Sequence, residues 1–256
     1  MAGRRAPSAR RPSWRSQHFL RTSALAAQLV RDADLGADDL VLELGAGKGR
    51  LTAELAGVVS RVRAVEIDSQ LAARLRGRWP NVEVIEGDAA RVRLPQEPFR
   101  VVANLPFDRT TDLLRLLLDD PRTPLLQADL IVEWGVAFKH SLPWPSTLNG
   151  VIWGAFYETS LTRRLPRTAF EPPPAVDAGV IVFKRRREPL IPSELIDPYR
   201  RFVSSGFRRG LRAMASTLAV KRIAGRGAAA RDLDTHQWVE LFLSQRPLRK
   251  SKSGSQ

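Results

Sequence analysis

The sequence contains no cysteine and only three histidines, His18, His140 and His236. Without cysteine, the chain cannot form disulfides, thiolate nucleophiles or zinc–thiolate centres. The three histidines are widely spaced, which argues against a histidine-based metal site. We therefore expect a protein whose chemistry needs no metal.

Long apolar runs are also missing. No segment approaches the roughly 18 consecutive apolar residues of a membrane-spanning helix, and the first residues lack the apolar stretch of a signal peptide. Hydrophobic residues nevertheless make up 43% of the chain, which is enough for a folded core. We expect a soluble, cytoplasmic protein, with a monomer as the default.

Acidic residues are scarce relative to basic ones. Lys and Arg number 41 against 27 Asp and Glu, which gives a formal net charge of +14. Such an excess favours a polyanionic partner, because neutralising phosphates releases counterions. A genomic bias toward arginine produces the same excess, so charge alone does not secure a nucleic-acid partner.

The chain divides into four parts that differ in composition and in the periodicity of their apolar residues. Residues 1–15 carry five arginines and no acid, which indicates a flexible basic tail. Strand and helix patterns alternate through residues 16–187, and residues 188–245 are helical in period. Residues 246–256 are polar and basic, as in a second flexible tail. We expect an α/β domain in the first long part and a small helical domain in the second.

Apolar periodicity locates the expected elements. Strands are expected at residues 40–44, 61–67, 82–86, 99–103, 130–134 and 180–184. Helices are expected at residues 23–31, 50–56, 69–78 and 111–118, and in the C-terminal part at residues 196–207, 212–220 and 235–244. Strands separated by helices of this length predict a Rossmann-like α/β core with a mainly parallel sheet and helices on both faces.

A glycine-rich loop follows the first long strand. Residues 43–49 read ELGAGKG, and Gly45 and Gly47 would permit a tight turn and a close approach of backbone to a ligand. The spacing differs from the GxGxxG of dinucleotide sites, although from this loop alone dinucleotide oxidoreduction remains open. A mere tight turn is the other interpretation, and the position between a strand and a helix favours the ligand site.

Two acids end the next two strands. Glu66, followed by Ile67, lies about 20 residues past the glycines, where a carboxylate accepts hydrogen bonds from ribose hydroxyls. Asp88, followed by Ala89, could accept a hydrogen bond from the exocyclic amine of an adenine. Either acid alone could be an exposed loop carboxylate, but three matched features after three successive strands favour a nucleoside-containing cofactor.

The fourth strand ends in the tetrapeptide NLPF, residues 104–107. It matches the [DN]-[IL]-P-[YF] pattern of methyltransferases that act on exocyclic amines. The Asn104 side-chain oxygen and the Leu105 carbonyl could accept both hydrogens of an adenine N6, which is a poor nucleophile. Pro106 would fix the turn, and Phe107 would stack on a base taken out of its helix. The other interpretation is a strand-end turn with a buried Phe.

The motifs together resemble the rRNA adenine N6-dimethyltransferase family, which includes the KsgA-type and the Erm macrolide-resistance enzymes. Residues 16–20 (SQHFL) are similar to the family's GQNFL or SQNFL segment, with His18 where Asn is common. ELGAGKG, the two acids and NLPF follow in the family's order. The resemblance covers roughly residues 14–245, and it implies a class I methyltransferase core that binds S-adenosylmethionine, plus a small all-helical C-terminal domain.

The resemblance also implies roles for individual residues. Residues 170–178 (FEPPPAVDA) are similar to the family's FxPxPxVDxA segment, so Phe170 would form a second aromatic wall of the adenine pocket and join residues 104–107 as catalytic. Cofactor contacts are expected at Gln17, His18, Leu20, Gly45, Gly47, Glu66, Ile67, Asp88, Ala89 and Asn104.

Basic residues near the expected domain junction are candidates for RNA binding, although any one pair could be a solvated helix face. They are Arg109, Lys184, Arg185, Arg186, Arg208, Arg209 and Arg212. A cleft between the core and a basic helical domain would suit folded RNA, with the backbone charge positioning the substrate.

The branch of the family is the last question. Phe107, and the Thr-Thr pair at residues 110–111, are more similar to actinobacterial Erm enzymes than to the NLPYN of KsgA-type enzymes. We therefore expect N6-methylation or dimethylation of an adenine in 23S rRNA that confers macrolide resistance. A KsgA-like enzyme of 16S rRNA and a non-catalytic RNA-binding factor on the same fold remain alternatives. Residues 132–137 (VEWGVA) depart from the family pattern, which leaves the loop above the site open.

Overall fold

The structure of the chain is a computed structural model that describes residues 17–142 and 147–245. Ser16 and the expected tails at residues 1–15 and 246–256 lie outside the described residues. The strands are β1 (Phe19–Leu20), β2 (Leu40–Leu44), β3 (Arg61–Glu66), β4 (Val82–Glu86), β5 (Phe99–Asn104), β6 (Leu125–Glu133), β7 (Tyr157–Leu165), β8 (Phe170–Glu171) and β9 (Ala178–Arg185).

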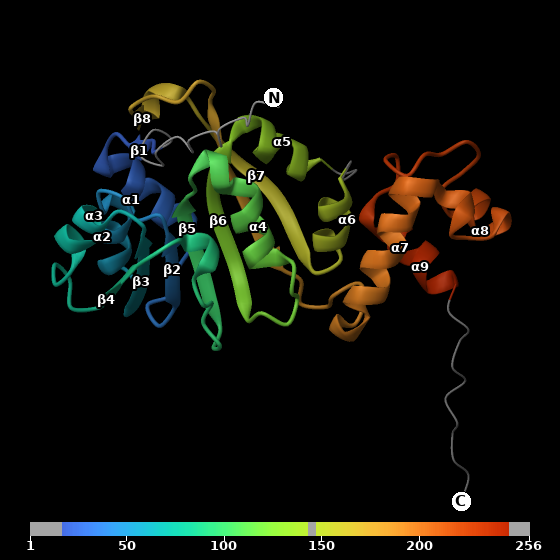
Figure 1. Cartoon of the computed structure of the whole chain (residues 1–256), viewed down its shortest axis with the longest axis horizontal. Coiled ribbons are helices and arrows are strands. Elements are labelled where there is room, and N and C mark those ends of the chain that lie inside the picture. Colours follow the sequence, from blue (N-terminus) through green and yellow to red (C-terminus); the bar gives the residue numbers. More distant parts are fainter. Residues whose placement is uncertain (1–16, 143–146, 246–256) are drawn as a thin grey trace, which may run out of the picture.

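The described α-helices alternate with these strands and then follow them (Figure 1). They are α1 (Ser23–Asp32), α2 (Arg50–Ala56), α3 (Ser69–Leu75), α4 (Thr110–Leu118), α5 (Trp134–Ser141), α6 (Leu148–Gly154), α7 (Ile196–Arg209), α8 (Thr217–Ile223) and α9 (Thr235–Ser244). Within the described ranges, no helix combines the length and the apolar character needed to cross a membrane.

Seven strands form the central sheet in the order β4-β3-β2-β5-β6-β9-β7. The first five are parallel to one another, whereas β9 is antiparallel to both β6 and β7. The predicted mainly parallel, Rossmann-like sheet is confirmed. The carboxyl ends of β2, β3, β4 and β5 therefore meet at one edge of the sheet, where such folds bind ligands.

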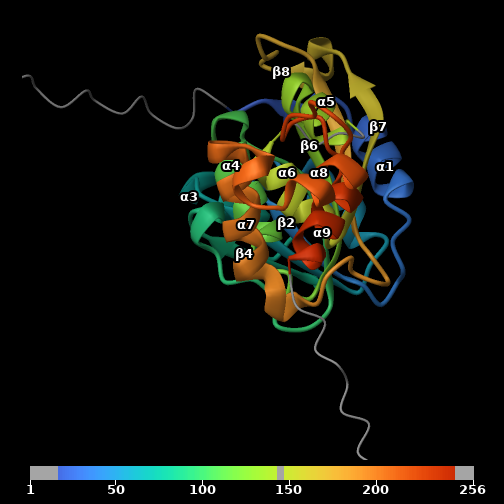
Figure 2. The same ribbon diagram turned by 90° about the vertical axis from the view of Figure 1, so that its right-hand side faces the viewer.

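Helices cover both faces of the sheet. On one face α1 and α2 pack on the strands through a cluster that includes Leu29, Leu51 and Val62. On the other face the core under α4, α5 and α6 continues without a break into α7 and α9, where Trp153 of α6 and Trp238 of α9 are both buried. Figure 1 shows the C-terminal helices beside α6, at the opposite end of the long axis from α3 and β4, and in Figure 2 these helices lie in front of the sheet.

Local signals explain where the C-terminal helices begin and end. Asp234 caps α9 with a full capping box. The predicted bounds of the helix at residues 212–220 are wrong, because α8 begins only at Thr217. Gly210, with φ +81°, ends α7, and a short 3-10 turn follows before Ser216 caps α8. The segment at residues 132–137, left open by the sequence, enters α5 directly at Trp134.

Candidate active site

The glycine-rich loop between β2 and α2 is held against the end of β3. The backbone N–H groups of Gly45 and Ala46 both donate to the carbonyl oxygen of Val65. Gly45 and Gly47 have φ values of +79° and +56°, a region that favours glycine. A Cβ on Gly47 would lie 2.7 Å from the Phe19 ring, so the loop also needs glycine to let β1 approach.

Glu66 ties this loop to the next turn. Its Oε2 accepts a hydrogen bond from the Gly47 N–H at 2.7 Å, and its Oε1 accepts from the Asp68 N–H at 2.8 Å. The residue is 2% exposed, so its carboxylate is fixed in orientation. A carboxylate has about four acceptor positions, and two remain for a ligand. Ile67 beside it is 52% exposed, a large apolar side chain on the surface of the same hollow.

A second hollow continues from Ile67 past Asp88 and Ala89 to Arg109. Asp88 Oδ1 accepts from the Ala90 N–H at 2.9 Å, and its Oδ2 faces the Arg109 guanidinium at 3.5 Å. Arg109 also pairs with Asp112 at 3.3 Å. The sequence grouped Arg109 with the RNA-binding cations, but the structure directs it at the carboxylate predicted to recognise the cofactor.

Asn104 ends β5 with its side-chain amide in a fixed orientation. Its Nδ2 donates to the carbonyl oxygen of His18 at 2.7 Å. Because a carbonyl can only accept, the amide oxygen must point the other way, and this Oδ1 is buried without a hydrogen-bond partner. Within the described residues no donor reaches the Leu105 carbonyl oxygen either. Two adjacent acceptors are thus left for a ligand in the hollow that Asn104, Leu105 and Pro106 line.

Pairing of β1 with β8 brings the N-terminal motif and the FEPPPAVDA segment together. Phe19 pairs with Glu171, and His18 Nδ1 lies 2.8 Å from the Pro172 carbonyl oxygen. The rings of His18 and Phe107 are 5.5 Å apart. Gln17 and His18 line the hollow at Asn104, and Leu20, 4% exposed, lines the adjoining one below Gly45.

Phe170, which the resemblance places as a second aromatic wall of the adenine pocket, lies inside the core of the structure. It lies 6.2 Å from Phe107 in an edge-to-face arrangement, and only 1% of it is exposed. It is part of the cluster that also contains Leu20 and Leu165. In this structure Phe170 supports Phe107 from behind, whereas the half-buried Phe107 faces the hollow.

The sequence missed one acid in this region. Glu43 lies at the end of β2, 1% exposed, and accepts a hydrogen bond from Thr52 Oγ1 at 2.6 Å. Burial, together with the nearby Glu66 carboxylate, raises the pKa of Glu43 to about 8 against the lowering effect of the Thr52 hydrogen bond. Glu43 is therefore mainly neutral at pH 7. The signal was available, since an acid inside an apolar strand is unusual unless paired or protonated.

The structure divides the predicted RNA-binding cations. Lys184, Arg185 and Arg186 lie at the end of β9, and Lys184 pairs with Gln127 near the start of β6. Because β9 is antiparallel, this end lies at the edge of the sheet away from Asn104. Arg185 donates to the carbonyl oxygens of Leu125, Pro121 and Thr123 and to the Tyr157 hydroxyl.

Arg186 is engaged in the same way, with the Gly154 carbonyl oxygen and the Glu158 carboxylate as acceptors. The prediction that Arg185 and Arg186 contact RNA is therefore not supported, since their donors already stabilise the fold. Arg208, Arg209 and Arg212 are exposed at the end of α7 and the turn after it. Lys184 is exposed as well, but it lies beside Arg185 at the edge away from the site.

Comparison with known proteins agrees with this geometry. The family model described as ribosomal RNA adenine dimethylase matches residues 10–232. An rRNA adenine N-6-methyltransferase of Bacillus licheniformis is 31% identical over 180 residues, which cover 69% of this chain but only 63% of that relative's length. The chain thus matches less than two thirds of that relative.

Longer matches occur with other relatives. The mycinamicin-resistance protein MyrB of Micromonospora griseorubida is 32% identical over 243 residues, which cover 88% of this chain and 76% of MyrB. The crystal structure of the 23S rRNA methyltransferase ErmE superposes with a TM-score of 0.77 at 28% identity, over 88% of this chain and 98% of that one. The fold expected from the sequence motifs is therefore that of a solved rRNA methyltransferase.

Proposed function

Because this chain belongs to the ribosomal RNA adenine dimethylase family, we propose that it methylates the N6 amine of an adenine in ribosomal RNA with S-adenosylmethionine as the donor. The observation that carries the proposal is the pair of unpartnered acceptors, Asn104 Oδ1 and the Leu105 carbonyl oxygen, in the hollow below Phe107. Residues 16–187 would then hold the catalytic machinery, and residues 188–245 would bind RNA.

The described residues fit the cofactor. When bound, S-adenosylmethionine supplies an electrophilic methyl group on a sulfonium. The remaining acceptor positions of Glu66 suit the ribose hydroxyls, and the exposed Ile67 side chain suits one face of the adenine ring. Asp88 Oδ1 already accepts from the Ala90 N–H, whereas Oδ2 has only the long contact with Arg109. Oδ2 would accept a hydrogen bond from the adenine amine in place of that contact. The left-handed Gly45 and Gly47 leave room for the methionine part.

Catalysis then consists of positioning the target amine. Its lone pair is delocalised into the purine ring, which makes it a weak nucleophile. Hydrogen bonds from its two N–H groups to Asn104 Oδ1 and the Leu105 carbonyl fix the nitrogen and increase electron density on it. A nitrogen held in this way would accept the methyl group that the bound sulfonium supplies, and the proton that it then loses would pass to water.

The aromatic side chains support the same role. Phe107 faces the hollow, and its ring is held between His18 and the buried Phe170. A base removed from its RNA helix needs an aromatic surface to replace lost stacking. Phe107 provides that surface, and Phe170 keeps its orientation.

The relatives favour 23S rRNA as the substrate. One is described as a 23S rRNA methyltransferase and another as a mycinamicin-resistance protein. Methylation of an N6 amine adds bulk and removes its hydrogen-bond donors. We propose that the modification excludes macrolides from the ribosome in this way.

A single experiment addresses the activity and the substrate together. Purified protein is incubated with tritiated S-adenosylmethionine and either a 23S rRNA transcript or 30S particles. Label is expected in 23S rRNA, and primer extension across that RNA should stop at one adenine. Asn104→Ala should lose the label while still binding S-adenosylmethionine. Asn81→Ala serves as the amide control, because the side-chain amide of Asn81 donates to the carbonyl oxygens of Ala56 and Val59.

The other outcomes have definite meanings. Label confined to 30S particles would assign the chain to small-subunit maturation. Tight RNA binding with no label in either substrate would indicate a non-catalytic RNA-binding factor. An active Asn104→Ala variant would refute the proposed role of the amide oxygen.

A further inference from the structure

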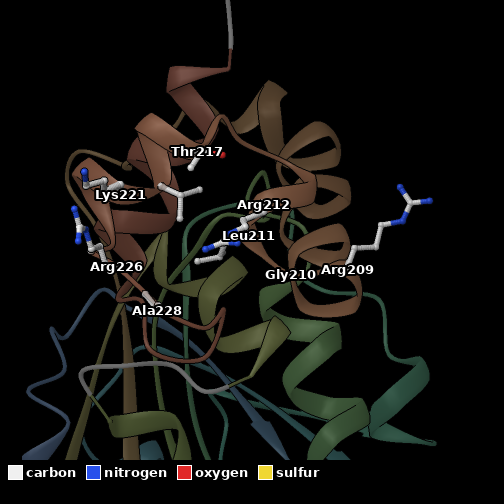
Figure 3. A pocket seen from close by; sticks show the side chains of 11 residues that line it. Arg209, Gly210, Leu211, Arg212, Thr217, Lys221, Arg226 and Ala228 are labelled. Atoms are coloured by element: carbon white, nitrogen blue, oxygen red, sulfur yellow. The ribbon is translucent and has the colours of Figure 1, made fainter.

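A cavity of about 360 Å³, here called the α1 cavity, lies on the face of the central sheet that α1 covers, apart from the hollows around Asn104. It is also distinct from the cationic pocket of about 550 Å³ within the C-terminal helices, where Figure 3 shows Arg212, Lys221 and Arg226. That pocket belongs to the part of the chain already proposed to bind RNA, whereas the proposed reaction makes no use of the α1 cavity.

The walls of the α1 cavity are mainly apolar. Five apolar residues of α1, α2 and the sheet line it, each at most 6% exposed: Leu29, Leu51, Val102, Ile131 and Val180. Its rim is polar, because Asp32 of α1 pairs with Arg163 of β7 at 2.7 Å, and Figure 2 shows these two elements on the same side of the molecule. A mainly apolar lining with few polar groups, and a volume of about 300–1,000 Å³, are typical of small-molecule sites.

One buried carboxylate interrupts this lining. Asp129 of β6 lines the cavity and is only 7% exposed. Its Oδ2 accepts a hydrogen bond from Gln127 Nε2 at 2.9 Å. Among the described residues, no donor reaches its Oδ1 and no cation forms an ion pair with either oxygen. A buried carboxylate that keeps its charge needs a cationic or strongly donating partner.

The cations around Asp129 are engaged elsewhere. Arg100 of β5 donates to main-chain carbonyl oxygens of the turn after α1 and pairs with Asp39 at 3.2 Å. Arg163 belongs to the ion pair at the rim, and Lys184 of β9 is exposed and forms no ion pair with Asp129 in the described part of the chain. Burial raises the pKa of Asp129 to about 6, against the lowering effects of its hydrogen bond and of Arg100. The carboxyl is therefore mainly ionised at pH 7 without an ion pair.

We propose that the α1 cavity binds a small apolar molecule that carries one protonated amine. The ammonium would donate to Asp129 Oδ1, and the apolar part would lie against the five residues of the lining. A hydrogen bond between two charged groups is stronger than one between neutral groups, and it gains further strength where water is excluded. The same carboxylate disfavours an anion, and an uncharged apolar molecule would leave it without a partner.

The position of the α1 cavity places such a ligand next to the active site. Leu51 also lines the hollow below Gly45. Ala103, another residue of the cavity, precedes Asn104 in β5. The ligand would therefore bind beside the cofactor hollow, at a site separate from the acceptors assigned to the target amine. This binding goes beyond the proposed function and does not depend on it.

The test compares two probes of the same shape, 2-naphthylmethylamine and 2-naphthalenemethanol, on the full chain. Saturation-transfer NMR and isothermal titration follow their binding at about pH 7.5, where an alkylamine is protonated. Asp129→Asn keeps the size of the side chain and an acceptor for Gln127 but removes the charge. Asp32→Asn is the matched control, because this second carboxylate of the cavity already pairs with Arg163. Val182→Phe fills the cavity from β9.

The wild type should bind the amine about tenfold more tightly than the alcohol, the effect of one hydrogen bond between charged groups. Asp129→Asn should lose this preference, Asp32→Asn should keep it, and Val182→Phe should weaken the binding of both probes. Equal affinity of the wild type for the two probes would overturn the proposal, as would the absence of saturation transfer to either. A preference for the amine that survives in Asp129→Asn would overturn it too, because the amine would then bind elsewhere.

The pH provides a second readout. Because the pKa of Asp129 is about 6, the affinity of the wild type for the amine should fall about tenfold between about pH 7.5 and about pH 5, whereas that for the alcohol should not change. Asp129→Asn should show no such fall. The charged groups that face this position are the same in both proteins: Asp32, Asp39, Arg100, Arg163 and Lys184. A parallel fall in the two proteins would assign the titration to another group and would overturn the role of Asp129.

Failure of the proposed function would show itself separately. A wild-type protein that transfers no methyl group to any rRNA would refute the proposed function, while the comparison of amine and alcohol would still decide what the α1 cavity binds. Circular dichroism and thermal unfolding check the fold of each variant. If Val182→Phe does not fold, the comparison of the two probes on the wild type, Asp129→Asn and Asp32→Asn decides alone.

Discussion

Asn104 and His18 are 86 residues apart in sequence, yet the amide nitrogen of Asn104 lies 2.7 Å from the main-chain carbonyl oxygen of His18. This contact fixes which end of the amide faces the hollow. The N-terminal motif therefore orients the group that we propose to hold the target amine. Because the His18 main chain makes this contact, it does not depend on the His18 side chain.

The first prediction concerns that amide. Asn104→Asp keeps an acceptor but loses the donor to His18, and it places a carboxylate oxygen beside a carbonyl oxygen. We expect kcat for methyl transfer to fall about 100-fold or more, as for removal of other preorganised polar groups, with a smaller change in the Kd of S-adenosylmethionine. Single-turnover transfer and isothermal titration measure the two quantities. Equal kcat for wild type and variant would contradict the positioning role.

Asp88 and Asp68 provide a matched pair for cofactor recognition. Each caps a short helical segment through Oδ1, Asp88 to Ala90 and Asp68 to Gln70 and Leu71. Only Asp88 lines the hollow with Ile67. Asp88→Asn preserves the cap but turns the second acceptor into a donor, which opposes an adenine amine.

We expect Asp88→Asn to raise the KM for S-adenosylmethionine about tenfold, the effect of one lost hydrogen bond, and Asp68→Asn to leave it within twofold. Initial rates at saturating RNA give both values. If the two variants behave alike, Asp88 acts only as a cap and does not recognise the cofactor.

Gly47 is expected to be indispensable in the glycine loop. An alanine there would adopt φ +56°, a conformation that costs about 1–2 kcal/mol for a residue with a Cβ, and its Cβ would lie 2.7 Å from the Phe19 ring. Gly87→Ala is the control, because nothing lies within 4 Å of its Cβ position. Urea unfolding should show Gly47→Ala less stable by about 1–2 kcal/mol or more, with weaker cofactor binding, and Gly87→Ala unchanged. Equal stability of the two variants would argue that β1 moves freely away from the loop.

Much of the fold could be predicted from periodicity and capping. Residues 40–44, 50–56, 82–86 and 235–244 form the expected elements without change of bounds. Thr22 and Asp234 cap their helices as such residues do. β7 was not predicted from the sequence, because one of its faces is exposed and polar and the burial of the strand depends on its pairing with β9. α6 escaped because glycines at its third and last positions weaken the helical pattern.

The candidate site divides in the same way. Motif spacing located Glu66, Asp88 and Asn104, because the carboxyl ends of parallel strands must meet at one edge. The interior roles of Arg185 and Arg186 could not be predicted, since they follow from the reversed direction of β9. The raised pKa of Glu43 depends on its burial in the folded protein. An acid within an apolar strand indicates such burial but does not establish it.

Glu43 leads to the last prediction, a pH dependence of stability. Its pKa is about 8 in the folded protein against 4.5 for an ordinary Glu. Between these values the folded chain keeps a proton that the unfolded chain has lost, so raising the pH favours unfolding by up to about 1.4 kcal/mol per pH unit. The stability that the neutral carboxyl provides is complete below the unfolded-state pKa of 4.5. It is lost as the pH rises through the folded-state pKa of about 8. Glu43→Gln is close in shape to the neutral acid and can still accept from Thr52, so it should remove this slope.

Urea unfolding of both proteins between about pH 5 and pH 9 measures the difference. Asp129 also has a raised pKa, about 6, because of its burial. It is common to both proteins, so its contribution cancels when the two free energies are subtracted. The variant should gain on the wild type steadily as the pH rises, and the gain should level off above about pH 8. A difference that stays constant over the whole range would mean that Glu43 is already ionised in the folded protein, with a charge buried between Thr52 and Glu66.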